Sequence, residues 1–196
     1  MGANIGSGMD AFRTVAKEFR GTLLLAVGGS SLLPLVARFA KVTPPWPDGV
    51  TLVTSLATLL VIIFVFQFLW KRAKRSVDKA MLWGGALVVL FGISYFTLFD
   101  IFVFPIPTTG ELGVAGCGWT SNARLIAADY LADPADGCPG NYQQLLEAAE
   151  YEARQLWRPN SLTAVKMALF SSWLALFGGV SLIVAAFVTY QVRRKD

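Results

Sequence analysis

The sequence predicts an all-α, polytopic membrane protein: a four-helix transmembrane bundle with a small helical, disulfide-linked outer module between the third and fourth spans. The 196 residues are 55% hydrophobic and only 15% charged, whereas soluble proteins carry about 25% charged residues. The charges gather in blocks that separate four uncharged runs, 21–37, 49–70, 80–99 and 167–192. A membrane-crossing helix needs about 20 apolar residues, with roughly 17 to 25 tolerated, so each run is long enough for one span.

These runs divide the chain into four expected parts. Residues 1–20 form a cytoplasmic amphipathic segment, 21–104 hold spans one to three, 105–161 form an extracytoplasmic helical module, and 162–196 contain span four and a basic tail. The first segment fits a helix in the inner membrane interface. It is interpreted as an extension of span one, with a pore-lining helix as the alternative.

Span one could also be read as a secretory signal peptide. Arg38 stands where a small residue should precede a cleavage site, and three further spans follow. An uncleaved first helix is therefore expected.

The distribution of basic residues predicts the orientation. Segments 1–20, 71–79 and 193–196 hold 11 basic residues in 33 positions, whereas 38–48 and 100–166 hold six in 78. Cytoplasmic loops of membrane proteins carry the excess of Lys and Arg. Both termini are therefore expected in the cytoplasm and residues 105–161 outside, as in a bacterial inner-membrane protein.

A basic cluster follows span two and consists of Lys71, Arg72, Lys74 and Arg75. It is interpreted as an orientation signal that anchors lipid headgroups. An acidic cytoplasmic partner is the second interpretation. Since the basic residues flank apolar spans, the net charge of +4 indicates topology, and no direct nucleic-acid binding is expected.

Small residues within the spans predict close helix packing. Span three carries three glycines, and span four carries three small residues at four-residue intervals: Gly84, Gly85, Gly92, Ser171, Ala175 and Gly179. Whether these contacts lie within one subunit or between subunits is left open, and a homo-oligomer or a larger membrane complex in the lipid bilayer is expected.

Asp100 is placed near the outer end of span three. An acid at this depth is usually paired or faces water. Arg38, Lys41 and Lys166 lie at a comparable level. We expect Asp100 to pair with Arg38 or Lys166 at the outer rim. An ion pair that fixes helix register is favoured over an ion-selectivity ring.

The outer segment predicts two helices and a disulfide. Ser121–Leu131 is expected to be helical, and a longer amphipathic helix is expected from Asn141, as its N-cap, to Trp157. Cys117 and Cys138 both lie on the predicted outer side and are expected to pair. A redox site is disfavoured because no Cys-x-x-Cys pair is present. After this module, Ser161 is expected to cap the helix that leads into span four.

Composition excludes most catalytic chemistry. The chain has no histidine and two cysteines, which removes His-based metal and haem sites, Ser-His and Cys-His nucleophile pairs, and four-thiolate metal sites. It also lacks a Gly-x-x-x-x-Gly-Lys phosphate loop. No enzyme, cofactor or metal is expected.

Three function classes remain. The first is a non-enzymatic oligomeric membrane protein, channel-like or sensing, whose outer module receives a signal. The second is an accessory subunit of a larger transport or respiratory complex. A membrane enzyme is the least favoured.

The outline of four spans with inside termini resembles several groups of small bacterial membrane proteins. These are transporter small subunits, immunity proteins to pore-forming toxins, and the membrane component of the Kiwa anti-phage system. The resemblance is one of outline alone and implies no residue roles. Tetraspanins also carry a disulfide-bearing loop before their last span, but their Cys-Cys-Gly signature is missing around Cys117 and Cys138.

Overall fold

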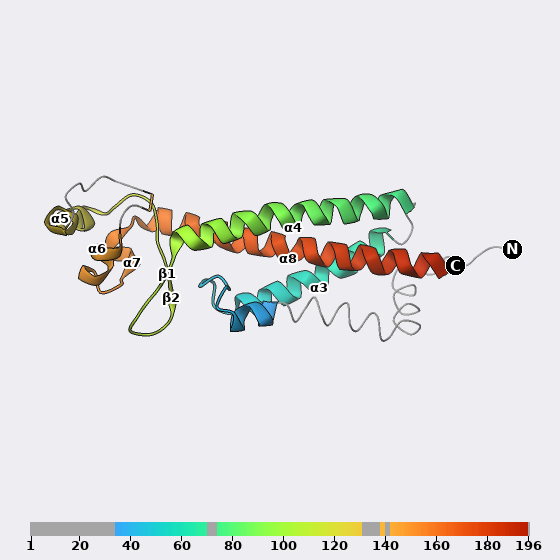
Figure 1. Ribbon diagram of the computed structural model, residues 1–196, viewed down its shortest axis with the longest axis horizontal. Coiled ribbons are helices and arrows are strands. Elements are labelled where there is room, and N and C mark those ends of the chain that lie inside the picture. The colour runs from blue at the N-terminus through green and yellow to red at the C-terminus, as the bar shows by residue number, and fades with distance from the viewer. Residues whose placement is uncertain (1–33, 70–73, 131–137, 140–141, 196) are drawn as a thin grey trace. The chain divides into compact units, whose positions relative to one another are not determined.

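The protein is described by a computed structural model over residues 34–69, 74–130, 138–139 and 142–195 (Figure 1). Most of these residues are helical. Three helices are long and apolar enough to cross a membrane: α3 (Val50–Leu69), α4 (Lys74–Phe102) and α8 (Pro159–Lys195).

The first expected span, 21–37, lies outside the described residues except for its last four, which belong to a helical stretch at 34–39. The amphipathic segment 1–20 also lies outside them. Three of the four expected spans are thus present as helices, and the four-span bundle stays a prediction.

The chain divides into two compact units. Among described residues, the first unit holds 34–43, 49–93 and 173–195, and the second holds 44–48 and 94–172. Helices α4 and α8 each contribute residues to both units.

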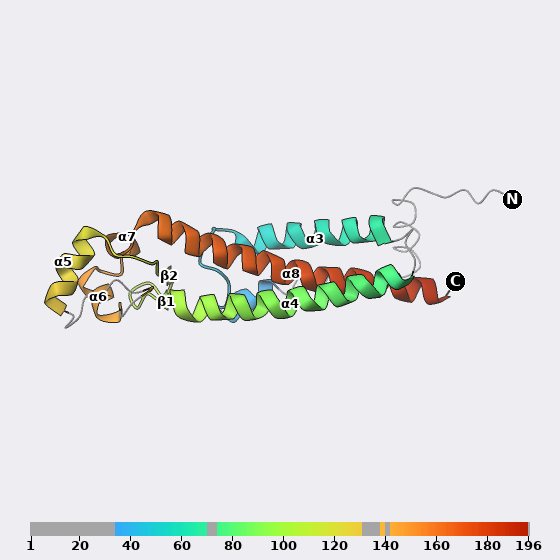
Figure 2. The same cartoon turned by 90° about the horizontal axis from the view of Figure 1, so that it is seen from above.

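In the first unit, α3, α4 and α8 lie side by side in both views (Figures 1 and 2). The hydroxyls of α3 are satisfied within their own helix: Thr54 donates to the Val50 carbonyl at 2.7 Å and Ser55 to the Thr51 carbonyl at 2.8 Å. Such bonds let hydroxyl side chains sit in apolar surroundings without a water path. Thr54 also accepts a hydrogen bond of 2.9 Å from the indole Nε1 of Trp173 on α8, so a buried polar contact joins α3 to α8.

Two glycines allow α4 and α8 to approach closely. A Cβ atom placed on Gly179 would lie 3.1 Å from the carbonyl oxygen of Gly84 and 3.0 Å from the Val88 Cγ2 atom. A Cβ on Gly84 would in turn lie 2.7 Å from the Ile183 Cγ1 atom. Contact of this kind between small residues is the usual means by which transmembrane helices bring their backbones together.

The second unit contains a short β-hairpin that an all-α class does not anticipate. Strand β1 (Val103–Pro105) pairs antiparallel with β2 (Leu112–Val114) directly after α4. The Ile106 amide donates to the Glu111 carbonyl at 2.8 Å, and Gly110 adopts a φ of +70°, which glycine reaches without steric cost. With only three residues in each strand, the hairpin is too short for an alternating pattern to reveal.

The first helix between α4 and α8 agrees with its prediction. Helix α5 (Ser121–Tyr130) begins at the expected residue. Thr120 precedes it, and the Thr120 hydroxyl accepts a hydrogen bond of 3.1 Å from the Ala123 amide, as an N-cap does.

The prediction of one amphipathic helix from Asn141 to Trp157 is wrong. The structure has two short helices, α6 (Gln143–Ala148) and α7 (Ala153–Leu156). Glu150 and Tyr151 between them have φ values of +50° and +61°, which no α-helix accommodates.

The spacing of apolar residues in 141–157 nevertheless predicted which side chains are buried. Its inward-facing side chains are buried: Leu145, Leu146, Ala149, Leu156 and Trp157. Tertiary contacts therefore use the expected apolar residues on a broken helix rather than a continuous one. Asn141, the expected N-cap, lies outside the described residues.

A backbone seam closes the second unit. The Thr120 amide donates to the Leu156 carbonyl at 2.9 Å, and the Arg158 amide donates to the Gly118 carbonyl at 3.2 Å. The Ser161 hydroxyl accepts a bond from the Cys117 amide. Ser161 therefore ties α8 to the loop before α5. The prediction that Ser161 caps this helix is wrong, because α8 begins two residues earlier, at Pro159.

The expected disulfide is present. Cys117 and Cys138 are bonded, with their Cα atoms 4.5 Å apart. The bond closes a loop that contains α5, and the seam holds the start of that loop against the segment that follows α7.

Candidate functional site

A cavity of about 430 Å³ lies within the second unit. This volume falls in the range of small-molecule sites, about 300 to 1,000 Å³. Four segments contribute to its wall: the loop before α3, the hairpin, the segment around α7, and the first turns of α8. The lining residues are Pro45, Trp46, Ile106, Leu112, Gly113, Val114, Tyr151, Glu152, Ala153, Arg154 and Lys166.

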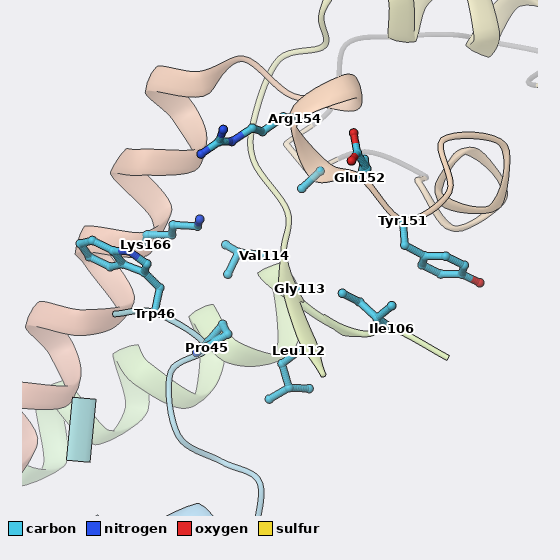
Figure 3. Close-up of a pocket in the computed structure, with 11 residues that line it drawn as sticks. Pro45, Trp46, Ile106, Leu112, Gly113, Val114, Tyr151, Glu152, Arg154 and Lys166 are labelled. Carbon is cyan, nitrogen blue, oxygen red and sulfur yellow. The ribbon is translucent and has the colours of Figure 1, made fainter. Parts of the chain in front are cut away.

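One side of the cavity is apolar, and the other carries charge (Figure 3). Val114 in strand β2 is buried and its side chain points toward α8, while Arg154 and Lys166 reach the cavity from α7 and α8. Glu152 contributes a carboxylate, which accepts a 2.9 Å hydrogen bond from the Gln155 side-chain amide. The cavity therefore has two cations and one anion in its wall.

The strained backbone between α6 and α7 shapes this site. Tyr151 has a positive φ and lines the cavity together with Glu152, Ala153 and Arg154. Because the helix is broken at Glu150 and Tyr151, α7 begins in a new direction and carries Arg154 to the cavity wall. Glu150 and Arg154 are four positions apart and would share one face of a continuous helix, but here only Arg154 is helical.

An aromatic contact lies beside the charged wall. Trp46 packs edge-on against Phe170 of α8, with ring centroids 6.1 Å apart. Phe170 follows Lys166 by four residues, so both share one face of α8. The cavity thus has an indole and an ammonium group in adjacent parts of its wall.

A second feature of this unit is an aromatic cluster near Asp100, which includes Phe104 of the hairpin. Phe104, Tyr142 and Trp157 have ring centroids 5.4 to 6.2 Å apart. Burial raises the pKa of the Tyr142 phenol, and the negative charge of Asp100 raises it further. The neutral phenol is therefore the form that this surrounding favours.

The predicted rim charges are divided between the two units. Arg38 and Lys41 are exposed residues of the first unit, whereas Asp100 and Lys166 belong to the second. Between those last two, within the described part of the second unit, the structure has no ion pair. Asp100 is exposed in the last turn of α4 and acts on Tyr142. Pairing of Asp100 with Arg38 stays a prediction.

Two members of the basic cluster belong to the first turn of α4. Lys71 and Arg72 are outside the described residues, Lys74 is the first residue of the helix, and Arg75 is exposed.

The small residues differ in their surroundings. Gly84 and Gly179 meet, and a Cβ on Gly92 would lie 3.6 Å from the Leu176 Cδ1 atom. A Cβ on Gly85 would have no neighbour within 4 Å. In α8, Gly179 is buried, whereas Ala175 is half-buried and Ser171 is exposed.

Sequence reasoning singled out Lys166 but missed the cavity. Trp46, Glu152 and Arg154, which also line the cavity, were not singled out as site residues. A signal was present in the loop composition, since three prolines surround Trp46 and two flank Ile106. These prolines favour turns, but no local pattern indicates that the two turns meet.

Within the described ranges, no group of three or more acidic or cysteine residues is placed to hold a metal ion. No family model matches the chain, and no curated protein or solved structure matches it.

Proposed function

We propose that this chain is a non-enzymatic membrane protein that senses a ligand at its outer module and works as a homo-oligomer. The observation that carries the proposal is the length of α8. This single helix of 37 residues contributes Ser161 and Lys166 to the seam and the cavity, and Gly179 to the packing against α4.

A continuous helix provides a physical basis for coupling. A ligand that binds the cavity better in one position of α8 shifts the population toward that position. The glycine contact with α4 is sensitive to such a displacement, because packed interfaces shift between discrete arrangements rather than deform smoothly.

Exposed apolar surface supports an assembly in the membrane. In the most apolar 18-residue stretch of α4, only 11% is buried, whereas in the corresponding stretch of α8 the buried share is 50%. Leu82, Val89 and Ile93 are each more than 60% exposed and recur at helical spacing. In a membrane, such an apolar face contacts either lipid or a neighbouring helix. In the proposed homo-oligomer, part of this face contacts a helix of another subunit.

We further propose the orientation that the basic residues indicate, with both termini cytoplasmic, residues 105–161 outside, and a bacterial inner membrane as the location. The cluster around Lys74 and Arg75 then faces the cytoplasm, where it holds anionic headgroups or an acidic partner. Cysteine accessibility tests this topology: a single cysteine added at exposed Glu147 is expected to react with an impermeant thiol reagent in intact cells, and one added near Arg75 only after lysis.

The assembly is tested by gentle detergent extraction followed by mass measurement of the intact complex. A homo-oligomer of three or more subunits supports the proposal. Association of one copy with a larger membrane protein instead supports an accessory subunit of a transport, respiratory, toxin-immunity or Kiwa-like defence complex. A monomer contradicts both.

Conductance separates the channel-like form of the proposal from the purely sensing form. The variant Asp100→Asn is expected to leave the mass of the detergent-extracted assembly unchanged. A changed conductance of this variant in planar bilayers then indicates that Asp100 faces an ion path. An assembly that dissociates indicates instead that Asp100 braces the helices.

A further inference from the structure

We infer that the outer cavity binds a phosphate group attached to an apolar moiety, with Arg154 and Lys166 as its cationic ligands and Trp46 as its apolar contact. This inference rests on the proposed sensing function and names the chemistry of its ligand. The phosphate could be the headgroup of an anionic phospholipid or part of a soluble molecule.

The charge of the cavity wall favours an anion. Arg154 and Lys166 form no ion pair with any residue that the structure describes, while Glu152 is engaged with the Gln155 side chain. Lys166 is half-buried and its ammonium group points into the cavity (Figure 3). A half-buried cation beside the buried side chain of Val114 gains from an anionic ligand more than it would in bulk water.

The two cations suit a phosphate in particular. Arginine presents a planar fork of N–H donors that binds two phosphate oxygens at once, and lysine adds a compact charge from another direction. Here they come from different helices, α7 and α8, so one anion between them would be held from two sides (Figure 3).

The apolar part of the cavity wall indicates that the ligand also has an apolar moiety. Trp46 is 38% exposed although it packs on Phe170. Lys166 and Phe170 both lie within the apolar helix whose membrane-length segment is Pro159–Gln191. A tryptophan next to a cation at the start of a span is typical of the headgroup level of a bilayer. We therefore expect the lipid to be the principal source of the phosphate.

The test uses the full-length protein in detergent and counts bound lipids on the intact assembly by native mass spectrometry. Wild-type protein is expected to retain phosphatidylglycerol and to release phosphatidylcholine, and to lose phosphatidylglycerol as salt is raised. Equal retention of the two lipids by the wild type overturns the inference. This comparison needs no variant and so does not depend on how well a variant folds.

The double variant Arg154→Gln with Lys166→Gln removes both cations. Its affinity for phosphatidylglycerol is expected to fall about 30-fold, as for the loss of two cations near a membrane surface. Arg158→Gln is the matched control, because Arg158 is an exposed arginine of the same module and does not line the cavity. Undiminished binding by the double variant overturns the inference.

A third variant distinguishes the sources of the phosphate. Trp46→Ala is expected to weaken phosphatidylglycerol and to leave binding of inorganic phosphate, measured by calorimetry, unchanged. Displacement of phosphatidylglycerol by inorganic phosphate at millimolar concentration would assign the site to a soluble ligand. Both results support the phosphate chemistry.

The same spectra separate this inference from the proposed function. A monomer that retains phosphatidylglycerol through Arg154 and Lys166 contradicts the oligomeric function and supports the site. An oligomer with no preference between the two lipids contradicts the site and leaves the function standing.

Discussion

Asp100 and Tyr142 form an electrostatic pair that a mutation can isolate. The charge of Asp100 adds to burial in raising the pKa of the Tyr142 phenol. We expect Asp100→Asn to lower the pKa of Tyr142. The measurement is an alkaline titration of tyrosinate absorbance, with the Tyr142 signal obtained as the difference from the same protein carrying Tyr142→Phe. An unchanged titration in Asp100→Asn would show that burial alone sets the pKa.

The same pair predicts a pH dependence of stability. A raised pKa means that folding favours the neutral phenol, so the stabilising contribution is present below the unfolded value of about 10 and is lost as the pH rises through the folded value. The melting temperature of the wild type should therefore fall more steeply above about pH 10 than the melting temperature of Tyr142→Phe. Parallel curves for the two proteins would contradict this.

The hydrogen bond from Trp173 to Thr54 is a buried polar contact between α8 and α3. Bonds of this type in membranes contribute about 0.6 kcal/mol on average and at most about 1.7 kcal/mol. We expect a double-mutant cycle of Trp173→Phe and Thr54→Val to give a coupling free energy in that range. The readout is unfolding in mixed detergent, and strictly additive effects of the two substitutions would show that the bond is energetically silent.

At the scale of elements, the contact of α4 with α8 depends on only one of two adjacent glycines in α8. Gly178 and Gly179 are neighbours in α8, but a Cβ on Gly178 would meet nothing within 4 Å, whereas one on Gly179 would meet the backbone of Gly84. We expect Gly179→Ala to lower the free energy of unfolding by about 1–3 kcal/mol, the usual cost of overpacking. Gly178→Ala is the matched control and should be neutral in the same unfolding assay. Equal effects would place the helix contact elsewhere.

At the scale of the whole molecule, the disulfide stabilises the module between α4 and α8 by restricting its unfolded chain. For residues 117 and 138, separated by 21 positions, the chain-entropy model gives roughly 3 kcal/mol. The double variant Cys117→Ser with Cys138→Ser should therefore lose the module at a lower temperature while its spans keep their helical circular dichroism. Limited proteolysis is expected to cut residues 121–157 first. A module as resistant as the wild type would show that the seam alone holds it.

The sequence predicts the elements that depend on local composition. The apolar runs behind α3, α4 and α8, the start of α5 at Ser121, and the pairing of Cys117 with Cys138 all follow from length, periodicity or compartment. The residues that become buried in α6 and α7 were also predictable, because burial follows apolar spacing even where the helix breaks.

The break itself was not predictable, since Glu150 and Tyr151 have no local preference for a positive φ. The Tyr151 amide donates to the Leu146 carbonyl at 2.8 Å, and the segment that follows is bonded to Gly118 and Thr120, far earlier in the chain.

The sequence by itself determined the apolar runs, three of which form helices long and apolar enough to cross a membrane, because hydropathy and charge act over short stretches of chain. Only the tertiary structure decided that Trp46, Arg154 and Lys166 share one cavity. Those residues are separated by as much as 120 positions, and nothing in the composition around any one of them indicates the other two. A site assembled across such distances depends on packing between elements, which local patterns do not encode.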